Sequence, residues 1–219
     1  MKTLLNKYKH AWVFLYGLIY FPWFIYLEKT VTKRYYVIHT SFDEIIPFIE
    51  IFIIPYLLWF GFVAITMMYF FFTNKNDFYR LSIFLFTGMT IFLIISTLYP
   101  NGQILRPTVF ERDNIFVDLV KRLYATDTPT NIFPSIHVYN SIGAYVGIRN
   151  SQRLKDNKFV QRGSLILATL IILSTMFLKQ HSVVDVLGAF VLAMPMYYLS
   201  YMYEPQKSTD VLNHCDITP

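Results

Sequence analysis

Long runs of apolar residues constrain the fold of this sequence more than any other feature. A helix needs about 20 apolar residues to cross the ~30 Å hydrocarbon layer of a bilayer. Three runs are clear, at 45–72, 81–98 and 183–203, and a fourth at 11–27 is slightly short but rich in aromatic residues. Two further runs, at 133–148 and 164–178, are shorter and carry polar residues, as expected for helices that face an internal cleft instead of lipid. We therefore predict an all-α polytopic membrane protein with six transmembrane helices.

The composition agrees with a membrane protein. Hydrophobic residues make up 55% of the 219 residues, which is too many for a water-soluble domain of this length. The formal charge of +5 does not indicate nucleic-acid binding, because Lys and Arg lie in short flanks between the apolar runs. Cys215 is the single cysteine, so an intramolecular disulfide and a Cys-rich zinc site are both excluded.

The distribution of Lys and Arg predicts the orientation in the membrane. With the N-terminus inside, eleven of the 19 basic residues fall on the inner side and eight on the outer side. A cluster in one short loop decides the assignment. Its members are Arg149, Arg153, Lys155, Lys158 and Arg162. Both termini are therefore expected in the cytoplasm, and the expected location is the plasma membrane with the active site facing outside.

The same topology places the long loop 99–131 outside. Within it, apolar residues recur at helical spacing near 113–125, which predicts an interfacial helix or one that packs as in soluble proteins, with Asp113 as its N-cap. Pro47 and Pro55 predict an interfacial segment and a kink at the start of the second run. The expected organisation is one membrane domain over 1–203 and a polar cytoplasmic tail over 204–219.

His181 and Asp185 are the first pair of residues that indicates chemistry. They are four positions apart, so on a helix they share one face. A carboxylate can then hold one imidazole nitrogen and leave the other unprotonated, as a histidine nucleophile or base requires. Taken alone, the pair is equally well explained as polar residues at a membrane interface.

A second element lies where a polar loop leads into the helix predicted over 133–148. Pro134 suits the first turn of a helix, and the free backbone N–H groups there, with the Ser135 hydroxyl, predict an anion-binding turn. His137 would stand beside a bound phosphate as a proton donor. Taken alone, these residues are better explained by ordinary helix capping, with His137 extending to water.

Two cations complete the candidate site. Arg106 can bind two phosphate oxygens at once, whereas Lys179 would act as a point charge. Either could instead contact lipid headgroups or extend to the membrane surface.

These elements, in this order, resemble the phosphatidic acid phosphatase type 2 superfamily of membrane lipid phosphatases and phosphotransferases. The family pattern is K-x6-R-P, then P-S-G-H, then S-R-x5-H-x3-D. The matching residues are Arg106-Pro107, Pro134-Ser135-x-His137, and Ser174 followed by His181-x3-Asp185. The resemblance implies that His181 forms a phosphohistidine, Asp185 orients it, His137 protonates the leaving group, and Arg106 and Ser135 hold phosphate oxygens.

The sequence departs from this pattern at three positions. Tyr99 replaces the Lys of the first motif, Ile136 the Gly of the second and Thr175 the Arg of the third. Ile136 still offers a backbone N–H to phosphate. Lys179, one helical turn beyond Thr175, is a candidate replacement for the missing charge.

The expected function is hydrolysis of a lipid phosphate or prenyl diphosphate within the membrane, without a metal or other cofactor, at the extracytoplasmic end of the bundle. The pattern also resembles sphingolipid headgroup transferases, so transfer to a lipid alcohol is the first alternative. Another is a metal site of His137, His181 and Asp185, and a third is a transporter with a proton relay. The sequence identifies neither the lipid nor the oligomeric state.

Overall fold

The computed structural model describes residues 7–203, so the expected tail at 204–219 and Cys215 lie outside the described residues. In chain order the elements are η1 (Lys9–Tyr16), α2 (Gly17–Thr30), β1 (Tyr36–Val37), α3 (Ser41–Ile45), η2 (Glu50–Phe52), α4 (Ile53–Thr73), α5 (Lys75–Leu98), β2 (Asn101–Gly102), α6 (Ile115–Thr126), α7 (Ile136–Asn150), α8 (Lys158–Phe177), α9 (Val183–Tyr197) and η3 (Tyr198–Met202).

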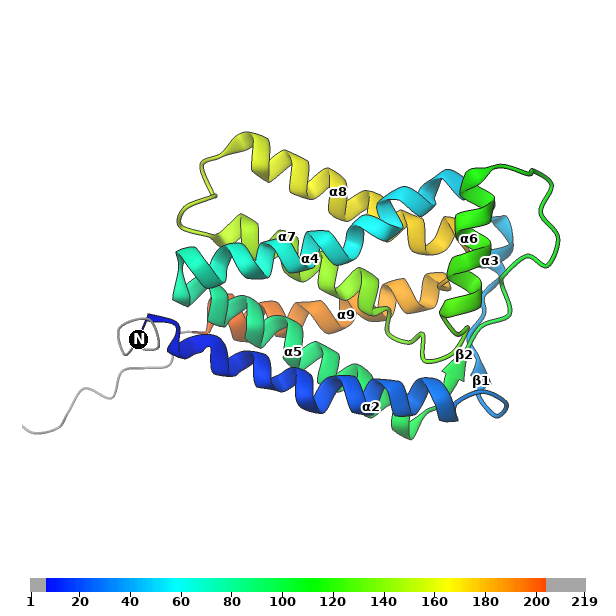
Figure 1. Cartoon of the computed structure of the whole chain (residues 1–219), viewed down its shortest axis with the longest axis horizontal. Coiled ribbons are helices and arrows are strands. Elements are labelled where there is room, and N and C mark those ends of the chain that lie inside the picture. Colours follow the sequence, from blue (N-terminus) through cyan, green and yellow to red (C-terminus); the bar gives the residue numbers. More distant parts are fainter. Residues whose placement is uncertain (1–6, 204–219) are drawn as a thin grey trace, which may run out of the picture.

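The long helices lie side by side along one axis, and α6 lies across one end of the bundle (Figure 1). Helix α7 is at the centre, where it packs against α4, α5, α8 and α9. Eight of its 15 residues are buried, among them Asn140 and Ser141. Because α7 faces other helices instead of lipid, it tolerates the polar residues that shorten its apolar run.

Five helical stretches are long and apolar enough to cross a membrane, and the chain is accordingly a multi-pass membrane protein. They are Lys9–Thr30, Glu50–Thr73, Lys75–Leu98, Lys158–Phe177 and Val183–Met202. Helix α7, in the sixth expected position, rises only about 22 Å over its 15 residues. The length criterion therefore supports five of the six expected spans.

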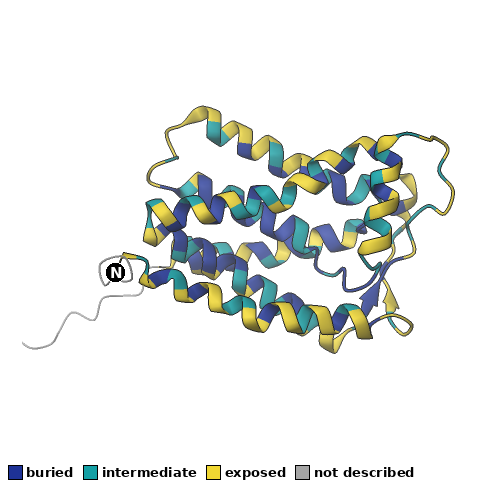
Figure 2. Ribbon diagram, in the orientation of Figure 1, coloured by how far each residue is buried: buried dark blue, intermediate teal, exposed yellow. Residues whose placement is uncertain are grey.

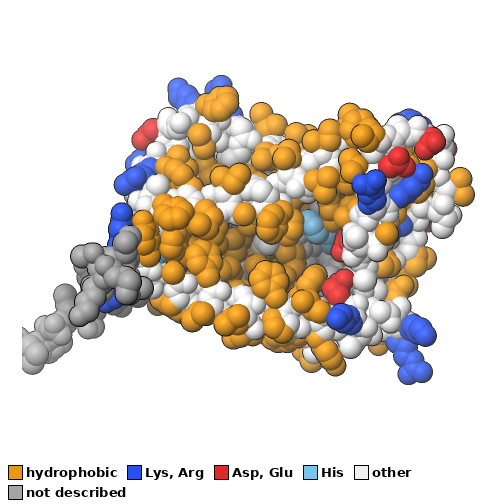
Figure 3. Space-filling model, in the orientation of Figure 1, with side chains coloured by type: hydrophobic (Ala, Val, Ile, Leu, Met, Phe, Trp, Pro, Cys, Tyr) orange, Lys and Arg blue, Asp and Glu red, His pale blue; other side chains and the backbone are white. Residues whose placement is uncertain are grey.

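The surface of the bundle fits a lipid environment. Exposed residues follow the outer faces of the helices, and hydrophobic side chains cover the sides of the molecule (Figures 2 and 3). Lys and Arg gather toward the two ends (Figure 3). An apolar band between two charged ends is the arrangement that a bilayer requires.

The second long helix begins later than its apolar run. Helix α4 starts at Ile53, after the short helices α3 and η2, instead of near residue 45. Pro55 lies in the first turn of α4, where its missing N–H costs no helical hydrogen bond, so it does not interrupt the helix.

Helix α6 occupies the position expected for a helix in the loop 99–131, but its N-cap is Asn114 and not Asp113. The Asn114 side chain accepts hydrogen bonds from the backbone N–H groups of Phe116 and Val117, each at 3.0 Å. The apolar face of α6 packs on the end of the bundle through Val120, in a cluster with Ile53 and Leu178.

Gly88 in α5 allows the closest contact between α5 and α7. A Cβ atom on Gly88 would lie 2.1 Å from Cζ of Tyr139. The Tyr139 ring cannot move freely, because its hydroxyl donates a 2.6 Å hydrogen bond to the Phe84 carbonyl. We expect Gly88→Ala to lower the free energy of unfolding by about 1–3 kcal/mol, seen as a lower melting temperature in detergent.

Gly61→Ala in α4 is the matched control. No atom lies within 4 Å of a Cβ placed there, so stability should stay level or rise slightly. Equal losses in the two variants would show that the Tyr139 contact is not the cause.

Candidate active site

His181 and Asp185 meet at the start of α9. Ser182 is the N-cap of this helix, and Asp185 completes a capping box by accepting a 2.8 Å hydrogen bond from the Ser182 N–H. Nδ1 of His181 lies 3.4 Å from the same carboxylate oxygen. The predicted pair is present, but the prediction of one shared helical face was wrong, because His181 precedes the helix. The carboxylate lies at Nδ1 and leaves Nε2 for chemistry.

A second carboxylate, that of Asp43 in α3, supports this turn. Asp43 is 2% exposed, and it accepts hydrogen bonds from Ser182 Oγ at 2.7 Å and from the Val183 N–H at 2.8 Å. The N-terminus of a helix favours negative charge, so α9 offsets part of the cost of burying this group. Asp43 therefore fixes the turn that carries His181.

His137 reaches the same place from the first turn of α7. Its ring centroid lies 5.7 Å from that of His181. On its other sides it contacts two aromatic rings of α4, with centroids 4.7 Å away for Tyr56 and 4.2 Å away for Trp59. The first turn of α7 and the turn before α9 thus bring the two histidines together, and aromatic rings of α4 pack on His137.

The loop that leads into α7 is held by buried amides. The Asn101 side chain accepts hydrogen bonds from the N–H groups of Ile132 and Phe133, both at 2.9 Å. Gln103 binds the Pro129 carbonyl through its N–H and donates from Nε2 to the Lys179 carbonyl. These two residues join the two loops that precede the histidines.

Strand β2 carries Asn101, and Gln103 follows it. The short parallel pairing of β2 with β1 holds both amides beside the loop that leads into α7. A Cβ atom on Gly102 would lie 2.7 Å from the Tyr35 ring and 2.8 Å from the Pro129 carbonyl oxygen, so glycine is needed at this close approach.

Arg106 lies behind the histidines and binds backbone in this structure. Its guanidinium donates to the carbonyls of Asp127 at 2.7 Å, Thr128 at 3.2 Å and Tyr124 at 3.3 Å, and to Oε1 of Gln180. It also stacks on the Tyr124 ring at 4.7 Å. Nε of Arg106 has no hydrogen-bond partner among residues 7–203. Arg106 is therefore next to the site but oriented toward the loop.

The other expected phosphate ligands differ in position. Ser135 is fully buried as the N-cap of α7, where its hydroxyl faces the Val138 N–H at 3.4 Å. Ile136 lines the cleft described below. Lys179 does not, because its ammonium donates to the carbonyls of Asp43, at 2.6 Å, and Ile46.

Thr175 and Tyr99, which replace two family cations, have structural contacts instead. The Thr175 carbonyl accepts hydrogen bonds from the N–H groups of Gln180 and His181, and the Tyr99 ring stacks on Tyr36.

A cleft of about 470 Å³ opens between α2 and α4 and ends at the histidines. Figure 3 shows the hollow with a histidine inside it and acidic side chains at its edge. Its lining residues are Tyr20, Phe21, Phe24, Ile25, Glu28, Trp59, Phe60, Phe92, Asp127, Thr128, Thr130, Asn131, Ile132, Ile136, His137, Gln180 and His181. One end of the cleft is therefore apolar and the other polar, as an amphiphile requires.

Glu28 ties α2 to the polar end of this cleft. Its carboxylate accepts hydrogen bonds from Thr128 Oγ1 at 2.5 Å and from Asn131 Nδ2 at 2.9 Å. Asn131 has a positive φ of 54°, a conformation that asparagine tolerates better than most residues.

Burial changes the ionisation of two groups beside the cleft. It lowers the pKa of His181 to about 3, with a further contribution from the Arg106 cation. Burial also raises the pKa of Asp127 to about 6, against the opposing effect of Arg106. His181 is consequently a neutral imidazole at physiological pH, which is the form that attacks phosphorus.

The metal-site alternative finds no support in the geometry. Among residues 7–203, no three side chains of His, Cys, Asp or Glu come together in a group that could hold a metal ion.

Several residues of this site carried no signal in the sequence. Thr40 and Asp43 match the spacing of a capping box, which α3 has, but nothing marked Asp43 as a partner of a helix 139 residues further on. Glu28, Asn101 and Asp127 belong to no motif, and only the fold brings them here.

Comparison with known proteins agrees with this site. A family model of the PAP2 superfamily matches residues 103–208. The match confirms the resemblance seen in the motifs, and it includes both histidines, Arg106 and Asp185. It indicates phosphatase-type activity. No curated protein and no solved structure matches the chain.

The raised pKa of Asp127 makes the stability of the protein depend on pH. The folded chain binds this proton more tightly than the unfolded chain, so its contribution to stability is full below pH 3.8 and is lost as pH rises to about 6. The melting temperature in detergent should therefore fall as the pH rises from 3.8 to about 6. We expect Asp127→Asn to remove the part of this fall that Asp127 causes. Asp118→Asn, on the exposed face of α6, should keep the wild-type pH profile; a flat wild-type profile would contradict the assignment.

Proposed function

We propose that this protein is an integral membrane phosphatase that hydrolyses a lipid phosphate through a phosphohistidine at His181. The observation that carries the proposal is the pairing of two histidine rings 5.7 Å apart at the polar end of a cleft that is apolar at its other end. Asp185, 3.4 Å from Nδ1 of His181, supports Nε2 as the nucleophile.

In the first proposed step, Nε2 of His181 forms a bond to phosphorus while the bond from phosphorus to the lipid oxygen breaks. His137, protonated in the presence of the phosphate charge, donates its proton to the departing oxygen. In the second step His137 takes a proton from water, which attacks the phosphohistidine and releases phosphate. Both histidines return to their starting forms, and no metal is needed.

Phosphate binding in this proposal relies on few cations. The backbone N–H groups at the start of α7, at Ile136 and His137, face an anion naturally because the helix has no internal partner for them. Arg106 would exchange some of its carbonyl acceptors for phosphate oxygens, since a charged acceptor forms the stronger hydrogen bond. We assign the Ser135 hydroxyl a capping role that positions this turn.

We further propose that α7 is a sixth span, shortened because it is enclosed by other helices. In this topology the basic loop between α7 and α8 and both termini are cytoplasmic, and the tail at 204–219 belongs to that side. The histidines, at the opposite end of the bundle, would face outward from the plasma membrane.

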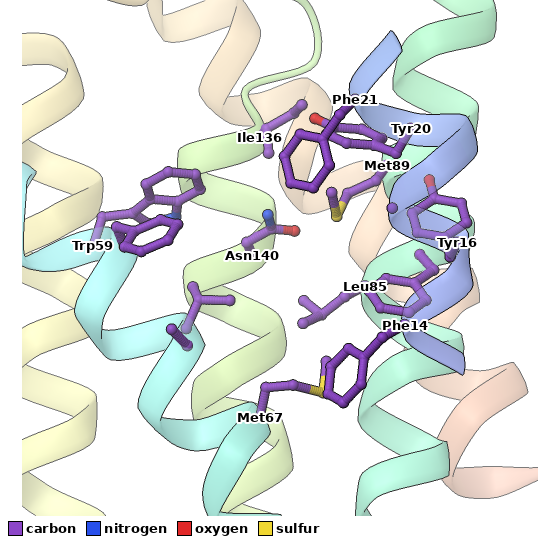
Figure 4. A pocket seen from close by; sticks show the side chains of 15 residues that line it. Phe14, Tyr16, Tyr20, Phe21, Trp59, Met67, Leu85, Met89, Ile136 and Asn140 are labelled. Atoms are coloured by element: carbon purple, nitrogen blue, oxygen red, sulfur yellow. The ribbon is translucent and has the colours of Figure 1, made fainter. Parts of the chain in front are cut away.

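The apolar walls of the cleft indicate the substrate class. A second cavity of about 290 Å³ adjoins the cleft, and the two share Tyr20, Phe21, Trp59, Phe60 and Ile136. Its lining is almost entirely aromatic and aliphatic (Figure 4). A hydrocarbon chain in this groove would bring its phosphate to the histidines from within the bilayer.

The test compares purified wild-type protein with His181→Asn on a panel of lipid monophosphates and prenyl diphosphates in excess EDTA. We expect the variant to lose at least about a thousandfold in kcat/KM, because the nucleophile is gone. His137→Asn should lose about 10²- to 10⁴-fold, the usual contribution of a positioned proton donor. A rapidly quenched reaction with labelled substrate should leave acid-labile phosphate on the wild-type chain.

His39→Asn is the matched control, because His39 is partly exposed and pairs with Glu44 outside the cleft. It should retain wild-type activity. Equal phosphate release by His181→Asn and the wild type would disprove the mechanism. Adding a lipid alcohol to the same assay separates hydrolysis from transfer, since a transferase would yield the phosphorylated alcohol in place of free phosphate.

A further inference from the structure

The apolar second cavity, called the groove below, contains one polar side chain, Asn140, whose amide oxygen accepts no hydrogen bond from the described residues. Asn140 lies in α7, one helical turn past Ile136, and its amide points into the groove between α7, α2 and α5 (Figure 4). The other lining residues are aromatic, aliphatic, methionine or glycine. An amide in such surroundings is costly unless something pairs with it.

Asn140 is nearly inaccessible to solvent, and its amide oxygen is unpaired in the part of the chain that the structure describes. It is 3% exposed, and its Oδ1 has no hydrogen-bond partner among residues 7–203. Trp59, across the groove, likewise has an Nε1 without a partner in the described chain. Asn150, at the other end of the same helix, shows the contrast, because its amide donates a 2.9 Å hydrogen bond to the Val146 carbonyl.

The position of Asn140 relates it to the catalytic end of the cleft. It follows His137 by three residues, which corresponds to about 4.5 Å along the helix axis, away from the α7 N-terminus and toward the bilayer centre. A lipid whose phosphate lies at the histidines would therefore place the first few carbons after its ester oxygen beside this amide.

We infer that Asn140 selects lipid phosphates that carry a hydroxyl or amide group on the second or third carbon from the phosphate ester, over lipid phosphates with a plain hydrocarbon chain. The carboxamide offers both a donor and an acceptor, so it can pair with either kind of group whichever way it is turned. A plain chain would leave it unpaired. This inference rests on the proposed phosphatase activity and names the substrate class within it.

The reason for selectivity is the cost of an unpaired amide. A site that is built to hydrogen-bond a substrate group discriminates against an analogue that lacks it, because the buried partner is then left without a bond. Replacing Asn140 by Leu, a similar volume without hydrogen-bonding atoms, removes this cost and keeps the groove filled.

The experiment uses two substrates that differ only in the group concerned. They are an oleoyl lysophosphatidate, which has a hydroxyl on the second carbon, and its 2-deoxy analogue. We expect the wild type to favour the hydroxyl form in kcat/KM by about tenfold or more, and Asn140→Leu to reduce this ratio at least about fivefold. Asn140→Ala should also reduce this ratio.

Asn150→Leu is the control for a hydrophobic substitution in α7 and should leave the ratio at its wild-type value. Because a ratio of two substrates is measured on one preparation, partial loss of folded protein does not change it. An Asn140→Leu ratio equal to that of the wild type, or a matching change in Asn150→Leu, would overturn the role of Asn140 while leaving the phosphatase activity intact. Absence of phosphate release from every lipid by the wild type would overturn both proposals.

Discussion

The carboxylate of Asp43, buried at the N-terminus of α9, is the contact on which the arrangement of the site depends. It accepts hydrogen bonds from Ser182 and Val183, and the carbonyl of the same residue receives the Lys179 ammonium. Together these bonds fix the sharp turn at 179–183, where Lys179 itself has a positive φ. Without this buried carboxylate, the Val183 N–H and the Ser182 hydroxyl would lose their acceptor at the edge of an apolar bundle.

The same turn sets the position of the His181 imidazole. Its place just before the helix, instead of within it, puts the imidazole over Asp185 while the main chain remains bound to Thr175. His137 meets it from α7, whose first turn is fixed by the Asn101 side chain through the preceding loop. A network of buried amides and carboxylates thus orients the two histidines, through Asn101 on one side and through Asp43 and Asp185 on the other.

The cleft combines this polar end with a groove suited to a chain of carbons. Helix α2 forms one wall and is held to the site by Glu28, which bonds Thr128 and Asn131. Glu28 and Asp127 add negative charge to the polar end of the cleft. Because burial raises the pKa of Asp127 to about 6, this group gains its proton and loses its negative charge as the pH falls below about 6.

Much of the fold could be predicted from the sequence, because the length and period of apolar runs depend on local composition alone. Five spans and the helix in the loop 99–131 follow from such patterns. The pairing of His181 with Asp185 was predicted from a shared helical face, but it arises from the turn before α9. The boundaries were less certain: α4 begins at Ile53 because a 3-10 turn takes up the start of its apolar run, and α6 is capped by Asn114 because that side chain reaches two free N–H groups.

What the sequence by itself determined is a membrane bundle with two histidines, an aspartate and an arginine in a recognisable order. What only the tertiary structure decided is their surroundings: Lys179 bound to the carbonyl oxygens near α3, Arg106 held by the loop, and Asp43, Glu28, Asn101 and Asn140 placed around the cleft. The physical reason is that each of these contacts joins residues far apart in the chain. Which buried polar group finds a partner depends on how the helices pack, and no local pattern of residues records that.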